Sequence, residues 1–373
     1  MWVWFFLLGI SYYGYYICKN QSLILHTRYA KNSRNVIIGC GIIFIFFSGL
    51  RSGIGDTGAY IYNFNKYKHY NIDQIKDLLS TKEPGFKLLI RIIGIVVDNE
   101  QIFLLIFAAI TIGLILRRIY LYSEDIGMSI FLFFATGIYA ATLNGLRQYL
   151  VVAIFFYFTN WIIEKKTLRF IILALILSTI HSSAIVMIPI YFLVRSKPWS
   201  FKTFVYLMIA LILAGNFSGF MENTSTILDS TVYSIYTDTL LNDTDQGANI
   251  LRVIVMCIPA LLSFLGRKNF EKDDIFYRVY SNMVLINAVV YIFAWYNWIF
   301  ARIGMFTSVY VLLFYPYVIN RIFTEKSKQL SKVFMVILFS FFGIYELHNT
   351  PYISYYLNIN RQLIGNITRT FYQ

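Results

Sequence analysis

The sequence predicts an all-α fold, a polytopic integral membrane bundle of about 12 helices that cross or half-cross the bilayer. Of its 373 residues, 58% are hydrophobic and only 14% are charged, whereas soluble proteins carry about 25% charged residues. Apolar runs recur along the whole chain at close to the length of about 20 residues that spans a bilayer. There are too few charges to cover a soluble core of this size, so the composition excludes an ordinary soluble enzyme.

Apolar runs bounded by charged residues predict the main helices. The first run has no positive segment before it and no A-x-A cleavage site, so we expect a retained span and not a cleaved signal. No Ser-, Gly- or Pro-rich linker divides the chain, and we therefore expect one integral domain over residues 1–373. The predicted helices cover residues 1–18, 36–50, 101–119, 126–143, 149–163, 202–219, 249–266, 279–299, 301–319 and 333–347.

The net charge of +13 has a different meaning in a membrane protein than in a soluble one. In a soluble chain it would suggest a nucleic-acid partner. Here it is the excess of cytoplasmic Lys and Arg that sets orientation, and no nucleic acid is expected. The outer side then receives loops 51–83 and 220–248 and the tail 348–373. The basic clusters placed in the cytoplasm are Lys19 to Arg34, Arg117-Arg118, Lys165 to Arg169, Arg195 to Lys202, Arg267 to Lys272 and Arg321 to Lys332.

Two segments do not fit simple spans. Residues 84–98 are short and begin with a proline in the first helical position; Lys87 and Arg91 share one face, so we predict an amphipathic helix lying at the outer surface. Residues 170–194 lie between two basic loops and must cross an even number of times. Two short helices that meet near His181 satisfy that requirement, as broken helices do where they line protein or a wet cavity.

Four arginines fall at the outer ends of predicted helices: Arg51, Arg147, Arg252 and Arg302. One such arginine would simply snorkel to lipid phosphate. Four on one side, against the positive-inside tendency and the cost of charge at membrane depth, point to a ligand. Guanidinium groups match phosphate oxygens bidentately, so a lipid diphosphate at the outer leaflet is the natural ligand.

Three ionisable residues are candidates for acid–base chemistry. Asp56 is either a base or an ion-pair partner of Arg51. Glu83 is either a helix cap or part of the site. His181 interrupts an apolar run and is either a structural histidine or a general base for a hydroxyl group.

Metal and nucleotide sites are not expected. The three cysteines lie in apolar stretches without a CxxC pair, which favours neither zinc nor a disulfide framework. Asp243-Thr244-Asp245 resembles a DxD metal motif but lies in an acidic outer loop. Gly53 to Gly58 forms a formal GxGxxG, but it follows a membrane helix and not a strand. Its glycines more plausibly permit a tight turn close to a ligand.

Short motifs in a fixed order resemble the EpsG/Wzy-type family of exopolysaccharide and O-antigen polymerases. They extend over roughly residues 50 to 320, most of the chain. The matching motifs are Arg51 to Tyr60 (R-S-G-I-G-D-T-G-A-Y), Glu83-Pro84-Gly85-Phe86, Asn144-Gly145-Leu146-Arg147-Gln148, His181-Ser182-Ser183-Ala184 followed by Pro189, and Arg302 opening a late helix.

This resemblance implies a GT-C-like glycosyltransferase of the bacterial inner membrane, with its active site facing the periplasm or outside. Such enzymes join oligosaccharide units carried on undecaprenyl diphosphate, which is both carrier and leaving group. No cofactor or metal is then required, and a chain-length regulator and a flippase are the expected protein partners. A flippase, or another lipid-linked glycan transferase or ligase, is the alternative reading.

The expected roles follow from the charge that the leaving diphosphate gains. Arg51, Arg147 and Arg302 would stabilise it, and we expect their guanidinium groups to converge in one pocket. His181, Asp56 or Glu83 would orient or deprotonate the acceptor, and the sequence does not choose among them. The remaining predicted substrate contacts are Lys87, Arg91, Asn144, Gln148 and Arg252.

Overall fold

The structure is a computed structural model. Most of the predicted helix 202–219, most of loop 220–248 with Asp243 and Asp245, and most of the tail 348–373 lie outside the described residues. The described residues are 2–25, 31–71, 74, 82–203, 205, 208–209, 212, 247–270, 274–349 and 356–357.

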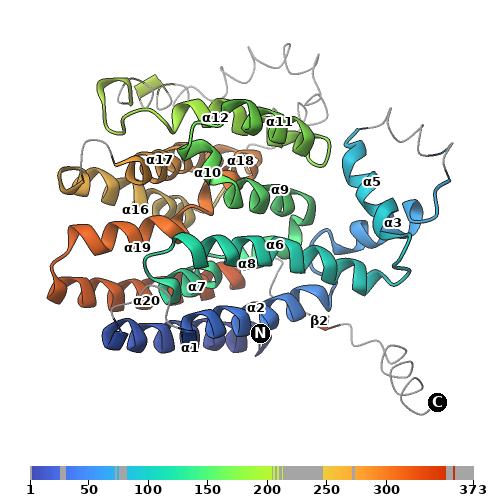
Figure 1. Ribbon diagram of the computed structural model, residues 1–373, viewed down its shortest axis with the longest axis horizontal. Helices are drawn as coiled ribbons and strands as arrows, with labels where there is room; N and C mark the ends of the chain where they lie inside the picture. The colour runs from blue at the N-terminus through green and yellow to red at the C-terminus, as the bar shows by residue number, and fades with distance from the viewer. Residues whose placement is uncertain are drawn as a thin grey trace. The chain divides into compact units, whose positions relative to one another are not determined.

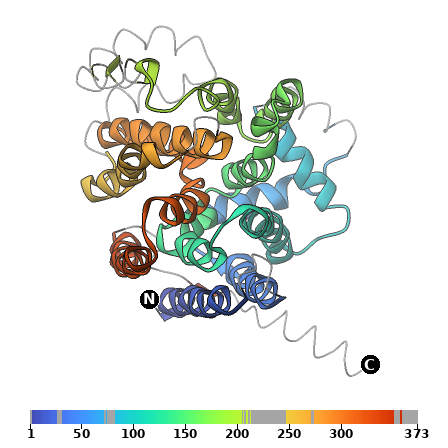
Figure 2. The ribbon, with the colours of Figure 1, turned by 60° about the vertical axis from the view of Figure 1, so that its left-hand side comes forward.

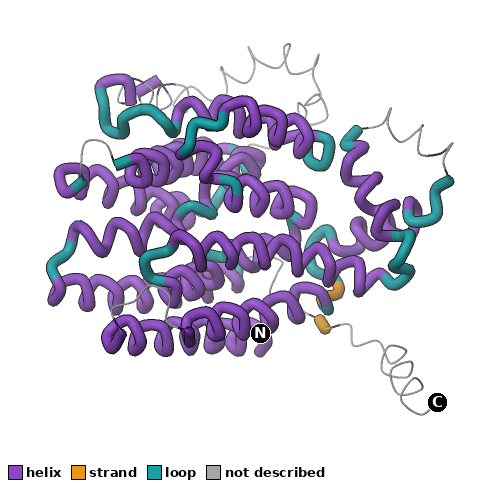
Figure 3. Tube along the Cα trace, viewed as in Figure 1, coloured by secondary structure: helices purple, strands orange, loops and turns teal. Residues whose placement is uncertain are grey.

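Helices make up nearly all of the described backbone, so the predicted all-α class is confirmed (Figure 3). The two strands, β1 (Arg51–Ser52) and β2 (Tyr356–Leu357), pair antiparallel. The helices are α1 (Trp2–Leu25), α2 (Lys31–Gly49), α3 (Thr57–Tyr67), α5 (Pro84–Ile93), α6 (Glu100–Tyr122), α7 (Ile126–Ala135), α8 (Ile138–Asn144), α9 (Leu146–Tyr157), α10 (Thr159–Ile163), α11 (Thr167–Ser178), η1 (Ser182–Val186), α12 (Met187–Leu193), α16 (Ile250–Gly266), η3 (Arg267–Asn269), α17 (Ile275–Tyr296), α18 (Ile299–Ser308), α19 (Val311–Ile322) and α20 (Glu325–His348).

In the described part of the chain, four helical stretches are long and apolar enough to cross a membrane. They are Glu100–Tyr122, Ile250–Asn269, Ile275–Tyr296 and Glu325–His348. Two bent pairs, α7 with α8 and α18 with α19, raise the number to as many as six. Spans of this number and composition are those of a multi-pass membrane protein.

Several helices differ from the predicted bounds for local reasons. The run predicted as one helix over 126–143 bends by 52° between α7 and α8, where Gly137 adopts a φ of 79° that a glycine tolerates at a helix end. The amphipathic helix predicted over 84–98 is shorter, since α5 ends at Ile93. Helix α9 begins at Leu146, three residues before the predicted start. This early start puts Arg147 in a helical first turn and not in a loop.

The chain divides into two compact units by its contacts. The first comprises Met1–Tyr157, Leu175–Ser182 and Phe334–Gln373, and the second comprises Phe158–Ala174 and Ser183–Val333. The single integral domain over 1–373 stays a prediction.

In the first unit, α2 packs on α1 and α6 (Figures 1 and 2). Helices α2 and α6 approach closely because Gly41 faces Leu116 and Gly49 faces Leu105 without an intervening side chain. The core between α2, α7 and α8 is aromatic, and Tyr139 donates a hydrogen bond from its buried hydroxyl to the carbonyl of Phe44 at 3.0 Å.

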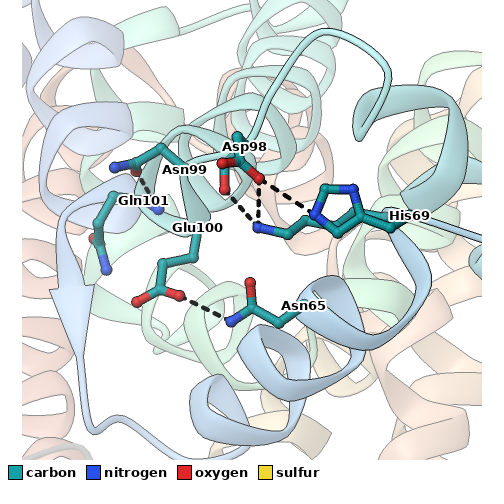
Figure 4. Close-up of polar contacts among 7 residues, drawn as sticks. Asn65, His69, Asp98, Asn99, Glu100 and Gln101 are labelled. Carbon is teal, nitrogen blue, oxygen red and sulfur yellow. Dashed lines mark hydrogen bonds and ion pairs between the residues drawn. The ribbon is translucent and has the colours of Figure 1, made fainter.

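Polar side chains fix the end of α3 against the start of α6 (Figure 4). Lys68 lies 2.6 Å from the carboxylate of Asp98 and donates to its carbonyl at 2.8 Å. Asn65 donates to Glu100 at 3.0 Å, and the side chain of Asn99 caps α6. Since α5 packs on α3, these contacts also hold the helix that begins just after Glu83.

The second unit is built around α17, which packs on α16, α18 and α19. Asn282, buried on α17, donates to the carbonyls of Val194 and Ser196 at 3.1 and 2.8 Å. Trp199 donates to the hydroxyl of Ser263 on α16 at 2.9 Å.

Candidate active site

Glu83 adopts a left-handed backbone conformation just before α5, with φ 54° and ψ 56°. A non-glycine residue there is uncommon and costs energy, so its surroundings must hold it. The next residues show how. Pro84 opens α5, and Gly85 donates from its N–H to the carbonyl of Thr179 at 2.8 Å. A Cβ at Gly85 would collide with Thr179, so only glycine permits this approach.

The carboxylate of Glu83 joins three segments that are distant in sequence. Oε2 accepts a hydrogen bond from Nη1 of Arg147 at 2.5 Å. Oε1 accepts from the backbone N–H and the hydroxyl of Ser182, at 2.9 and 3.2 Å. Nδ1 of His181 lies 3.2 Å from the same Oε1. The Glu83 side chain is only 10% exposed, so these contacts replace its water.

The pKa of Glu83 follows from this arrangement. Burial alone would raise the pKa, but the hydrogen bonds from His181 and Ser182 and the charge of Arg147 outweigh burial and lower it to about 2. Glu83 is therefore ionised at any physiological pH and is a weak proton acceptor.

Arg147 occupies the first turn of α9, where the helix dipole disfavours a cation. The Glu83 carboxylate offsets that cost. The guanidinium carbon lies 5.2 Å from the ring centre of Phe86 and 5.9 Å from that of Tyr60. Its Nε is buried and has no hydrogen-bond acceptor in the described part of the chain. A buried donor without an acceptor is costly and needs an explanation, and a bound anion would supply one.

His181 lies where the chain breaks between α11 and η1, so the predicted pair of short helices meeting near His181 is confirmed. Its side chain is 15% exposed. Nδ1 faces Glu83, and no described residue bonds to Nε2. The imidazole therefore has one nitrogen against the Glu83 carboxylate and one open to a ligand.

The loop after α2 brings Asp56 to the residue that opens the Asn144 motif. The backbone N–H of Asp56 donates to Oδ1 of Asn144 at 2.9 Å, while the Asp56 side chain is exposed. Gly55, with a φ of 47°, lies against the Asn144 side chain so closely that a Cβ would overlap it. Gly55, in the predicted tight turn, therefore allows close packing against Asn144 within the protein.

Arg51 is 1% exposed. Its Nη1 donates to the carbonyl of Ser48 at 2.5 Å, and its Nε donates to the hydroxyl of Thr57 at 3.2 Å. Thr57 in turn donates to the carbonyl of Ile54 at 2.6 Å. These contacts tie the end of α2 to the start of α3.

The other predicted substrate contacts lie at separate places. On α5, Lys87 lies 5.6 Å from the ring centre of Tyr67, and burial and the neighbouring positive charge of Lys66 lower its pKa. Arg91 donates to the carbonyl of Tyr70 at 2.6 Å. Gln148 is buried in α9 beside Arg147.

Arg252 and Arg302 belong to the second unit, where Arg302 stacks over the ring of Trp298 at 4.6 Å. The expected convergence of Arg51, Arg147 and Arg302 in one pocket therefore stays a prediction. No described group of three or more His, Cys, Asp or Glu side chains could hold a metal ion.

Sequence reasoning did not single out Ser182, Thr179, Tyr60 or Phe86. Ser182, Tyr60 and Phe86 lie inside the quoted motifs, but none is ionised at neutral pH, so no charge argument marked them. Thr179 contributes a backbone carbonyl, which the identity of a residue does not reveal.

The EpsG family matches residues 35–359, which is most of the chain. No curated protein and no solved structure matches the chain. The matched region contains Glu83, Arg147 and His181 together with all the helices from α3 to α20. The chain therefore belongs to the EpsG family.

Proposed function

We propose that this protein is a polysaccharide polymerase of the bacterial inner membrane, which joins oligosaccharide units carried on undecaprenyl diphosphate at the outer face. Membership of the EpsG family supports the polymerase class. The observation that carries the proposal is the meeting of three motif segments at the buried carboxylate of Glu83. It joins a cation, Arg147, to a candidate base, His181.

In the proposed reaction, an acceptor hydroxyl attacks the anomeric carbon of the donor unit, and the lipid diphosphate leaves with the bonding electron pair. The diphosphate gains negative charge in the transition state, and preorganised cations lower that barrier. Arg147 suits this role because Glu83 holds it in place and its Nε has no acceptor among the described residues. The N-terminus of α9 favours the same anion. The proposed step uses no metal and no cofactor.

Gene deletion followed by gel analysis of the surface glycan tests this function. If the protein is a polymerase, deletion of its gene should remove the ladder of long glycan chains but leave the single-unit product. Returning the gene for the full chain should restore the ladder. The Arg147→Lys variant, produced at normal abundance, should not restore the ladder, because a lysine cannot form bidentate hydrogen bonds with a phosphate group. Arg267→Lys is the matched control, since Arg267 is exposed and donates to the carbonyl of Phe264 in the preceding helix α16.

A flippase is the second candidate class, because it too would bind a lipid diphosphate. Its deletion would leave single units on the cytosolic leaflet, and no single-unit product would reach the surface. That result would replace the polymerase proposal.

A further inference from the structure

We propose that Glu83 is a positioning residue that fixes the Nδ1–H tautomer of His181 and so makes Nε2 of His181 the base for the acceptor hydroxyl. This inference rests on the proposed function, and it selects one base from the three ionisable residues that the sequence leaves open.

The tautomer follows from the partners of Glu83. An ionised carboxylate only accepts hydrogen bonds. Its Oε1 lies 3.2 Å from Nδ1 of His181, close enough for an ion pair but without the alignment of a hydrogen bond. A lone pair on Nδ1 would face this negative oxygen unfavourably, so the hydrogen belongs on Nδ1. A neutral imidazole has one N–H, and the nitrogen that keeps it is set by its hydrogen-bond partner. The lone pair is then on Nε2, which no described residue occupies.

The carboxylate itself cannot turn away. Oε2 is held by Arg147 and Oε1 by the N–H and hydroxyl of Ser182. Its backbone is held by Pro84 on one side and by the docking of Gly85 on Thr179. A single ionised group therefore orients the base with one oxygen and the proposed anion-binding arginine with the other. The distance between base and cation is thereby set by one rigid side chain.

The other two candidates are poorer bases. Glu83 has a pKa of about 2, and both oxygens already accept hydrogen bonds. Asp56 has an exposed side chain, and its described contact with the Asn144 motif is made by its backbone N–H.

A second histidine–carboxylate pair provides an internal comparison. His69 lies 3.7 Å from Asp98 near the end of α3, but these side chains are 71% and 83% exposed (Figure 4). An exposed pair is screened by water and holds neither partner in one geometry. The pair of His181 and Glu83 is thus largely buried, whereas the pair of His69 and Asp98 is open to solvent.

The proton balance of the step is simple. Nε2 of His181 accepts the proton of the acceptor hydroxyl while its oxygen bonds to the anomeric carbon. The bond from that carbon to the diphosphate oxygen breaks, and its electron pair leaves with the lipid diphosphate beside Arg147. The imidazolium is stabilised by Glu83 until it returns the proton to water.

Nitrogen NMR of the purified full chain, labelled with ¹⁵N-histidine, tests the tautomer without any substrate. The chain has 4 histidines, so the His181→Gln spectrum assigns the signals. At a pH where imidazole is neutral, we expect a protonated Nδ1 and an unprotonated Nε2 for His181. Glu83→Gly, which suits the left-handed backbone, should shift His181 towards the Nε2–H form. Asp98→Asn should leave the His181 signals unchanged. An Nε2–H tautomer in the unmodified protein overturns the inference.

Polymer synthesis tests the role of the base. Membranes containing the full chain are supplied with lipid-linked units extracted from the deletion strain. His181→Asn should slow ladder growth by about 100-fold or more, the loss expected for a general base, whereas the matched His69→Asn should not. A normal ladder from His181→Asn overturns the inference but leaves the polymerase proposal standing. A normal ladder from the gene deletion overturns the polymerase proposal itself.

Discussion

Nη1 of Arg147 lies 2.5 Å from Oε2 of Glu83, although 64 positions separate the two residues in the chain. Glu83 precedes the short helix α5, and Arg147 lies in the first turn of α9. The pair neutralises a cation at a helix N-terminus and leaves Nε of Arg147 buried without an acceptor in the described part of the chain. A substitution that keeps the charge of Arg147 but removes its guanidinium group should therefore affect function more than folding.

Arg147 and Arg51 should respond differently to substitution by lysine. Arg147→Lys keeps the charge near Glu83 but loses the planar fork, so we expect normal protein abundance and little or no polymer. Arg51→Lys removes the buried bond from Nε to Thr57, which should cost about 1–3 kcal/mol of stability and lower abundance. Immunoblots and thermal unfolding in detergent, with the glycan ladder scaled to protein amount, separate the two effects. A stable Arg51→Lys protein that makes no polymer would instead support a role of Arg51 on the diphosphate.

Two glycines should be essential and a third replaceable. In Gly85→Ala the added methyl group collides with Thr179 and should release α5, with loss of both stability and polymer. Gly55→Ala should do the same, because its φ of 47° is strained for alanine and the methyl group meets Asn144. Gly58→Ala, in the open on α3, should stabilise the protein by roughly 0.5–1 kcal/mol. Thermal unfolding and the glycan ladder check all three; a destabilised Gly58→Ala would contradict the steric account.

Asn144 should couple to Gly55 energetically. Asn144→Ala removes the acceptor that Asp56 uses at 2.9 Å, so it should destabilise the loop as Gly55→Ala does. Because both changes break one contact, the double variant should lose less than the two single losses added together. Unfolding free energies of the single variants and of the double variant measure the coupling. Additive losses would mean that the two residues act independently.

Acid should destabilise the protein through Glu83. Its pKa in the folded protein is about 2, below the ordinary value of 4.5. The carboxylate therefore contributes its full stability above about pH 4.5, on the order of 3 kcal/mol, and loses it as the pH falls towards 2. Thermal unfolding measured across this window should fall less steeply for Glu83→Gln than for the unmodified protein.

The matched control for that measurement is Glu100→Gln, whose carboxylate accepts one hydrogen bond from Asn65. It should keep the acid dependence of the unmodified protein. An unchanged slope in Glu83→Gln would show that Glu83 is not the group that titrates.

The amino-acid sequence by itself determined the class of this protein. Long apolar runs with few charges allow only a bundle of membrane helices, because a soluble fold would need more charge on its surface. The break at His181 and the start of α5 were also readable, since a polar residue interrupts one run and Glu83-Pro84 opens another. The ordered motifs predicted the family, and the match over residues 35–359 confirms it.

Only the tertiary structure decided which charged residues meet. Arg51 and Arg147 look alike in sequence, because both lie at a helix end: Arg51 follows α2, and Arg147 lies in the first turn of α9. Their partners separate them: Arg51 donates to Ser48 and Thr57, whereas Arg147 shares Glu83 with His181. Contacts of this kind depend on how distant segments pack, here on a glycine that lets α5 lie against the carbonyl of Thr179. Side-chain type reveals which chemistry is available, and packing determines which groups are close enough to perform it.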